Sequence, residues 1–291
     1  MKINSIVIIC LLLLSACKTI QNNNTSTADI SSVNGPLALV VERPPAPQIC
    51  HAQKGPIDPE SYGDAWQRVS KQLSMSVPDN RRVRAQKSWY VNHPSYLTRV
   101  TRRAEPYLYF IVDELEKRNL PLELALLPIV ESAYDPFAYS HGRASGMWQF
   151  IPGTGKGYGL AQNWWYDGRR DVFLSTHAAL DYLSYLNKRF KGDWLLALAA
   201  YNSGQGNVSK AIRKNKKKGK PTDFWSLKLP RETKAYVPKL LALAEILRTR
   251  KEANIPWSIV KNQPYFVRIP TEVQIDLSLA ADLGEQSMQD F

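Results

Sequence analysis

Residues 124–152 read LALLPIVESAYDPFAYSHGRASGMWQFIP, a stretch that places one carboxylic acid at the end of an almost wholly apolar run. The run from Leu124 to Val130 predicts a short buried helix, and Glu131 follows it directly. A carboxyl group in this position is expected to be desolvated, which raises its pKa and lets it keep a proton near neutral pH. Such a group can act as a general acid, for example on a glycosidic oxygen. Most glutamates are surface residues, so Glu131 alone does not decide the chemistry.

The sequence on either side of this stretch predicts a mostly helical fold. Apolar residues recur with helical spacing in segments that span 105–119, 122–132, 171–190, 193–201, 206–215, 232–251 and 273–283. Alternation typical of a strand occurs only at residues 265–269. The fold class is therefore predicted to be mostly α, with a small C-terminal α/β element over residues 256–291.

Composition and charge narrow the class of protein and its partners. Of the 291 residues, 44% are hydrophobic and 22% are charged, which excludes collagen, disulfide scaffolds, coiled coils and polytopic membrane proteins. The 38 basic and 26 acidic residues give a net charge of +12, which favours a polyanionic partner. Nucleic acid, an acidic envelope polymer and a membrane surface all fit at this point. The basic run at 213–220 is equally consistent with a solvated loop and with an anion-attracting surface.

The N-terminus indicates where the protein works. A lysine at position 2 and an apolar run over 6–14 are typical of a secretory signal, and the run is too short to span a bilayer. The sequence LSAC at 14–17 resembles the lipobox of bacterial lipoproteins. We therefore expect residues 1–16 to be a signal peptide, Cys17 to be lipidated, and residues 17–60 to be a flexible tether. Lys18 is similar to the residue after the cysteine in lipoproteins of the outer membrane, so we expect that membrane and the periplasm, which excludes nucleic acid.

Several familiar chemistries are excluded by their missing motifs. The sequence has no HExxH, no CxxC and only four scattered histidines, so no metal site is expected. The glycine-rich segment 153–159 is not a phosphate-binding P-loop, and no GxSxG nucleophile motif is present. No cofactor is expected either. Cys10 lies in the signal peptide and Cys17 is the lipidation site, so Cys50 has no partner for a disulfide.

Three ordered segments resemble the family 1 lytic transglycosylases, also called SLT-domain enzymes. Residues 131–152 are similar to the first family motif, AAYNSG at 199–204 to the second, and ETKAYV at 232–237 to the third. The segments WYDGRRD at 165–171 and DFW at 223–225 are similar to a membrane-bound subgroup of that family. This resemblance covers roughly residues 80–270. It implies a lysozyme-like fold of the goose-type lysozyme kind, with the catalytic domain and an N-terminal helical extension at 61–255.

The resemblance also implies a reaction, with Glu131 as the single catalytic acid and base. In this family the acid protonates the oxygen between N-acetylmuramic acid and N-acetylglucosamine in peptidoglycan. It then takes the proton of the muramic 6-hydroxyl, which closes on C1 and leaves a 1,6-anhydro end without adding water. The 2-acetamido group stabilises the cationic centre, so no second protein carboxylate is required.

Other residues correspond to family positions that bind substrate. Ser140 is expected to bond the acetamido group or Glu131, Gln149 to contact sugar, and the Tyr201 hydroxyl to reach the catalytic carboxyl. Asn202 is expected mainly to turn the chain, and Gly146 to permit close backbone approach or a positive φ. Glu232 and Tyr236 are weaker candidates that also fit a scaffold role. Tryptophans that could stack on sugars, or pack in the core instead, stand at positions 148, 164 and 165.

Two alternatives to the transglycosylase reading stay open. The first is a muramidase that adds water with the help of an aspartate such as Asp167 or Asp171. The second is a non-catalytic lipoprotein that binds peptidoglycan, although a binder has no need of a desolvated acid. In each case the partners are glycan strands of peptidoglycan and the outer membrane, and a monomer is expected.

Overall fold

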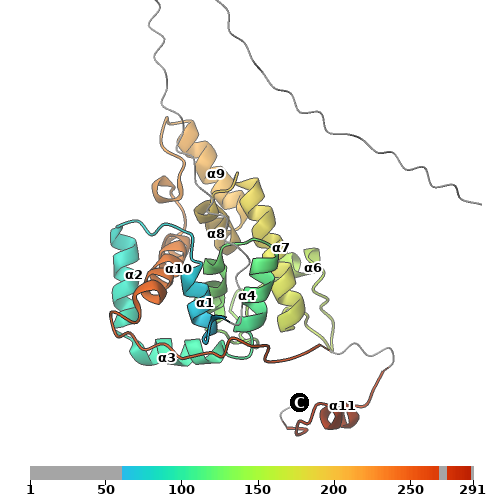
Figure 1. Ribbon diagram of the computed structural model, residues 1–291. Coiled ribbons are helices and arrows are strands. Elements are labelled where there is room, and N and C mark those ends of the chain that lie inside the picture. The colour runs from blue at the N-terminus through green and yellow to red at the C-terminus, as the bar shows by residue number, and fades with distance from the viewer. Residues whose placement is uncertain (1–60, 269–273, 290–291) are drawn as a thin grey trace, which may run out of the picture. The chain divides into compact units, whose positions relative to one another are not determined.

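The computed structural model describes residues 61–268 and 274–289, and this part of the chain is helical with no strand (Figure 1). The predicted signal peptide, Cys17 and the tether over 17–60 lie outside the described residues. The helices are α1 (Ala65–Lys71), α2 (Arg81–Val91), α3 (Pro94–Arg103), α4 (Leu108–Lys117), the 3₁₀ helix η2 (Leu122–Leu126), α5 (Leu127–Ser132), α6 (Pro152–Gly157), α7 (Val172–Arg189), α8 (Trp194–Ser203), α9 (Gln205–Lys216), the 3₁₀ turn η3 (Phe224–Ser226), α10 (Arg231–Thr249) and α11 (Leu277–Leu283).

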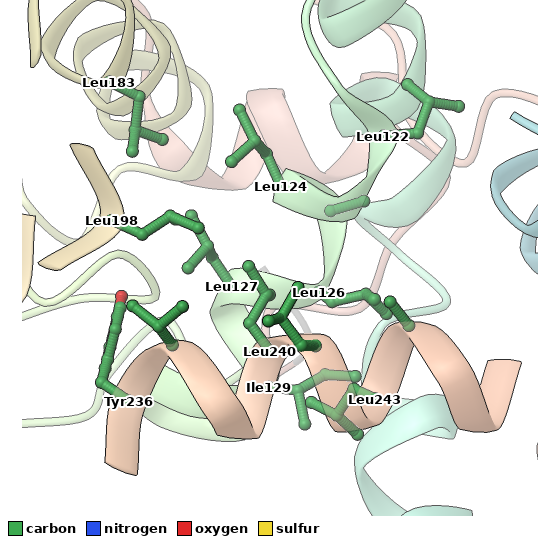
Figure 2. Close-up of a cluster of buried hydrophobic side chains, with 14 of the residues drawn as sticks. Leu122, Leu124, Leu126, Leu127, Ile129, Leu183, Leu198, Tyr236, Leu240 and Leu243 are labelled. Atoms are coloured by element: carbon green, nitrogen blue, oxygen red, sulfur yellow. The ribbon is translucent and has the colours of Figure 1, made fainter. Parts of the chain in front are cut away.

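Helix α10 is the centre of the core. It packs against α1, α2, α5, α8 and η2, and its leucines belong to one apolar cluster with those of η2, α5, α7 and α8 (Figure 2). Two of the helices in this cluster, α7 and α8, each begin after an aspartate that caps the helix. Asp171 accepts a hydrogen bond from the Leu174 amide at the start of α7, and Asp193 accepts one from the Leu196 amide at the start of α8. These caps fix where each helix starts relative to the core.

The sequence predicted a single helix over 122–132, and this prediction is wrong. The segment forms the 3₁₀ helix η2 and then restarts as α5, with Pro128 in the first turn. Proline has no amide hydrogen to donate to a carbonyl four residues earlier, so it fits a helix start and not a helix interior. The restart leaves α5 only six residues long, with Glu131 in its last turn.

The predicted C-terminal α/β element is wrong for the residues that the structure describes. Tyr265 to Arg268 form no strand, and only the helix α11 follows over Leu277–Leu283. Alternation alone does not make a strand when no second strand pairs with it. Residues 256–262 instead pack on the helical domain, because the Val260 carbonyl accepts the Ala65 amide at 2.8 Å and the Ser258 amide donates to Thr101 Oγ1 at 3.0 Å.

Across the described ranges, none of the helices combines the length and the apolar character needed to cross a membrane.

Candidate active site

A cleft of about 490 Å³ lies where α5, the loop after it, α8 and the start of α10 meet. Seven of the eight residues predicted to act at the site line this cleft, and the exception is Gly146. The cleft is lined by Val130, Glu131, Ser140, Ala144, Gln149, Phe150, Ile151, Thr154, Tyr182, Tyr201, Asn202, Ser203, Gly204, Glu232, Tyr236 and Lys239.

The cleft carboxyl, Glu131, is held at the end of α5 by an abrupt chain reversal. Ala133 and Tyr134 both have left-handed backbone angles, with φ of 55° and 59°. Such angles cost residues with a side chain about 1–2 kcal/mol each, so surrounding contacts must stabilise them. Tyr134 supplies those contacts, since its ring is buried and its hydroxyl donates to the Ala125 carbonyl at 2.6 Å.

The neighbouring Ser132 ties α5 to the loop that forms the opposite wall. Its hydroxyl donates to the Met147 carbonyl at 2.9 Å and accepts the Asp135 amide at 3.2 Å. The following carbonyl, of Trp148, accepts the Tyr201 hydroxyl from α8 at 2.9 Å. Three segments far apart in sequence are thereby held around the Glu131 carboxyl.

Gly146 supports this loop from outside the cleft. Its φ is +84°, and a Cβ built on it would lie 1.8 Å from the Arg169 carbonyl oxygen. Only glycine fits both the angle and the space, as predicted for this position. Because Gly146 does not line the cleft, its role is to let the backbone of residues 169–170 approach the motif loop.

The electrostatics of the cleft keep a proton on Glu131 near neutral pH. The pKa of Glu131 is raised to about 7, mainly by burial of the carboxyl, and the nearby Glu232 carboxylate contributes to the increase. The hydrogen bond from Tyr236 and the charge of Lys239 act in the opposite direction and lower the pKa. Burial is the largest of these effects, which is the environment predicted from the apolar run.

The tyrosine that contacts the acid is not the one predicted. The Tyr236 hydroxyl donates to Glu131 Oε1, whereas the Tyr201 hydroxyl donates to the Trp148 carbonyl. Burial raises the pKa of both phenols well above the ordinary value, so both act as neutral donors. Tyr236 therefore orients the acid, and Tyr201 fixes the wall of the cleft.

The remaining predicted residues form the polar rim of the cleft. Ser140 Oγ accepts the Ala144 amide at 3.0 Å, which leaves its own proton free to be donated. Gln149 has a φ of 50°, and its amide nitrogen donates to the Gly146 carbonyl at 2.8 Å. Asn202 donates to Glu232 Oε1 at 3.0 Å and accepts from Thr233 Oγ1 at 2.7 Å, which joins α8 to α10.

The aspartates considered for a water-adding mechanism do not line the cleft. Asp167 forms an ion pair of 2.7 Å with Arg169, and this pairing lowers its pKa. Asp171 caps α7 and accepts the Tyr166 hydroxyl at 3.0 Å. The second carboxylate in the cleft is Glu232. Nowhere in the described part of the chain do three or more histidine, cysteine or acidic side chains cluster as metal ligands would.

Sequence reasoning missed two contributors to the site. Lys239 lines the cleft and acts on the Glu131 carboxyl, and its place three residues after Tyr236 on the same helix is a signal that could have identified it. Ser132 belongs to the motif, but its bond to the Met147 carbonyl crosses 15 positions and has no signature in the sequence.

Comparison with known proteins identifies the family. The model of the transglycosylase SLT domain matches residues 109–224, which include Glu131 and Asn202 and end before α10. The protein named "Putative tributyltin chloride resistance protein" from Alteromonas sp. (strain M-1) is 43% identical over 189 residues, which are 64% of this chain and 89% of that protein. The chain belongs to the SLT-domain transglycosylase family.

Membrane-bound lytic murein transglycosylase D of Escherichia coli (strain K12) is a more similar relative. It is 51% identical over 222 residues, which are 76% of this chain and 49% of that protein. The chain thus spans about half the length of this relative. Among solved structures, an inactive mutant of the lytic transglycosylase Slt from Pseudomonas aeruginosa aligns with a TM-score of 0.40 and 22% identity, over 67% of this chain and 33% of that one.

Proposed function

We propose that this protein is a lytic transglycosylase that cleaves the glycan strands of peptidoglycan without adding water. The observation that carries the proposal is the Glu131 carboxyl, which lies in a cleft and has a pKa raised by burial to about 7. A carboxyl with this pKa is protonated in a useful fraction at neutral pH and can still lose its proton during the reaction. Membership of the SLT-domain family supports the same substrate. We also propose a lysozyme-like architecture for the domain.

The reaction needs one group that first gives and then takes a proton. Glu131 protonates the oxygen between N-acetylmuramic acid and N-acetylglucosamine, and the bond from C1 of the muramic residue to that oxygen breaks. The resulting carboxylate accepts the proton of the muramic 6-hydroxyl, whose oxygen bonds to C1. Glu131 ends with the proton count it began with, and the product carries a 1,6-anhydro ring.

The surrounding residues orient the acid and the sugar. Tyr236 donates to Glu131 Oε1, which leaves Oε2 to hold the proton that is transferred. Lys239 stabilises the carboxylate that forms midway, because its charge lowers the pKa of Glu131. Ser140, Gln149 and Asn202 present hydroxyl and amide groups along the cleft, where we place their contacts with the sugar.

A muramidase is the second candidate, and Glu232 is the observation in its favour. Its carboxylate lies in the same cleft as Glu131 and raises the pKa of that acid. A hydrolase could use such a carboxylate to activate water. However, the side-chain amide of Asn202 donates a hydrogen bond to Glu232 Oε1 and accepts one from Thr233 Oγ1. Both hydrogen bonds join α8 to α10. This arrangement favours a scaffold role for Glu232.

The mass of the products tests the proposal. Purified sacculi are incubated with the wild type, Glu131→Gln and Glu232→Gln, and the released muropeptides are analysed by mass spectrometry. We expect products one water lighter than hydrolysis products, from the wild type and Glu232→Gln but not from Glu131→Gln. Reducing-end products that depend on Glu232 would establish the muramidase. Sacculus binding without any release by the wild type would establish a non-catalytic binder.

We further propose that the mature protein is a monomeric lipoprotein of the outer membrane that faces the periplasm. The support is the lipobox-like LSAC at 14–17, followed by Lys18. Two or more acyl chains on Cys17 would give stable anchoring where one would not. Cell fractionation tests this: Cys17→Ala should lose its place in the outer-membrane fraction, and retention there would contradict lipidation at Cys17.

A further inference from the structure

The loop between α6 and α7 presents two neighbouring tryptophans to solvent. Trp164 and Trp165 are 88% and 91% exposed, whereas Trp66 and Trp148 are completely buried in the core. An indole is among the largest apolar surfaces that a side chain offers. Two adjacent exposed indoles contribute almost nothing to the core, and such patches mark binding surfaces.

The backbone under the two indoles is fixed by hydrogen bonds. Asn163 Oδ1 accepts the amides of Trp165 and Tyr166 at 2.9 and 2.8 Å, and the Asn163 amide donates to the Tyr166 carbonyl at 2.9 Å. The two rings meet edge to face, with their planes at 88°. A ligand would therefore find these rings already positioned, and little order would have to be created on binding.

The surroundings of the indoles are polar and carry both signs of charge. Trp164 and Trp165 line a shallow depression together with Asn163, Tyr166, Asp167, Arg170 and Asp171. A sugar ring offers an apolar face of C–H groups for an indole and hydroxyls at its edge for carboxylates, amides and guanidinium groups. An acyl chain or an anionic headgroup fits less well, because two carboxylates border the depression.

This loop is directly braced to a wall of the catalytic cleft. The Arg169 guanidinium donates to the Phe150 carbonyl at 3.0 Å and to the Arg143 carbonyl at 2.7 Å, and Phe150 lines the cleft. Gln162 donates to the Pro152 carbonyl at 3.1 Å, directly beside the cleft residue Ile151. The indoles and the cleft therefore share one rigid support in residues 143–152.

We propose that Trp164 and Trp165 form a second glycan-binding platform, which stacks on sugar rings of a peptidoglycan strand outside the cleft. The inference rests on the proposed function for the identity of the glycan. The platform would hold a long strand at the enzyme between cuts and would contribute nothing to a substrate that occupies the cleft alone.

Binding is tested with the full chain carrying Glu131→Gln, so that the strands stay intact. The ligands are glycan strands stripped of their stem peptides, and the variant is Trp164→Ala with Trp165→Ala. We expect binding at least about tenfold weaker, because two stacking surfaces are lost. Tyr265→Ala, which removes another well-exposed aromatic ring, is the matched control and should bind as before. Unchanged binding by the double variant would overturn the platform.

Two further measurements separate the platform from other roles. With Glu131 intact, the double variant should cleave a short peptidoglycan tetrasaccharide at the wild-type rate, and a matching fall in that rate would place the indoles in the cleft. Vesicles of phosphatidylethanolamine and phosphatidylglycerol should bind the variant and its parent equally, and a loss confined to vesicles would assign the indoles to a membrane. If the wild type makes no anhydro products while strand binding still depends on the indoles, the proposed function fails and the platform stands.

Discussion

At the scale of single residues, the chemistry depends on a balance of opposing effects on one carboxyl group. Burial and the Glu232 carboxylate favour the neutral form of Glu131, while Tyr236 and Lys239 favour the charged form. The effects that raise the pKa let Glu131 donate a proton near neutral pH. The effects that lower the pKa stabilise the carboxylate that forms when the proton is donated. Removing either side should therefore shift the pH dependence of the reaction in a direction that can be stated in advance.

Tyr236→Phe should move the alkaline limb of the pH profile to higher pH. The Tyr236 hydroxyl stabilises the Glu131 carboxylate and lowers its pKa, so its loss lets Glu131 keep the proton at higher pH. We expect kcat/KM at the optimum to fall about tenfold, because the acid loses an orienting hydrogen bond. Rates measured from pH 5 to pH 9 check this. Tyr201→Phe is the control, and a shift in that variant alone would restore Tyr201 as the partner of the acid.

Glu131→Gln should be more stable than the wild type at alkaline pH. The pKa of Glu131 is about 7 in the folded chain and close to 4.5 when unfolded. Below pH 4.5 the carboxyl is protonated in both states and costs no stability. As pH rises from there to about 7, the unfolded chain releases the proton first, so the wild type loses on the order of 3 kcal/mol relative to the variant. Denaturant unfolding at pH 5 and pH 8 measures this, and parallel pH dependence of the two proteins would refute it.

At the scale of elements, the site is built by short irregular segments, which were harder to predict than the long helices. The helices predicted over 171–190 and 232–251 are confirmed as α7 and α10. Helix α7 buries one apolar face, whereas α10 is buried on nearly all sides from Tyr236 to Leu247. The split of 122–132 into two helices, and the bond from Ser132 to the Met147 carbonyl, depend on Pro128 and on contacts across the fold. The wrong prediction for Tyr201 has the same physical reason. Tyr201 and Tyr236 both fit a family motif, and only the packing of the fold decides which hydroxyl donates to Glu131.

Gly146→Ala should destabilise the motif loop by about 3 kcal/mol or more. The new Cβ would overlap the Arg169 carbonyl, and φ at this position is +84°. The matched control is Gly153→Ala in α6, where a Cβ meets nothing within 4 Å. That variant should be neutral or slightly stabilised, since alanine favours helix. Thermal unfolding checks both, and equal melting temperatures for the two variants would contradict the close approach of the loops.

At the scale of the whole described domain, its early and late segments are joined by one carboxylate. Asp64 Oδ1 caps α1 through the Trp66 amide and accepts the Val260 amide at 3.2 Å. Asp64 Oδ2 pairs with the buried Arg250 at 2.8 Å. The sequence predicted that a separate small element begins at residue 256. Long-range bonds such as these have no local signature, so the packing of 256–262 on α1 and α3 was not predicted.

Asp64→Ala should lower the free energy of unfolding by about 2–4 kcal/mol. It removes a helix cap and leaves the Arg250 guanidinium buried without its partner. Asp276→Ala removes a similar cap from α11, where no buried ion pair depends on it, and should cost about 1 kcal/mol or less. Chemical denaturation of both variants is the measurement. The claim fails if the two substitutions cost the same.

The central claim, that Glu131 closes an anhydro ring without water, is tested most directly by isotope incorporation. Sacculi are digested by the wild type in water enriched in heavy oxygen, and the new muramic ends are analysed by mass spectrometry. We predict ends that are one water lighter than hydrolysis products and carry no heavy oxygen. One atom of heavy oxygen at each new end, in a digest that stops with Glu131→Gln, would contradict the claim and make the enzyme a hydrolase.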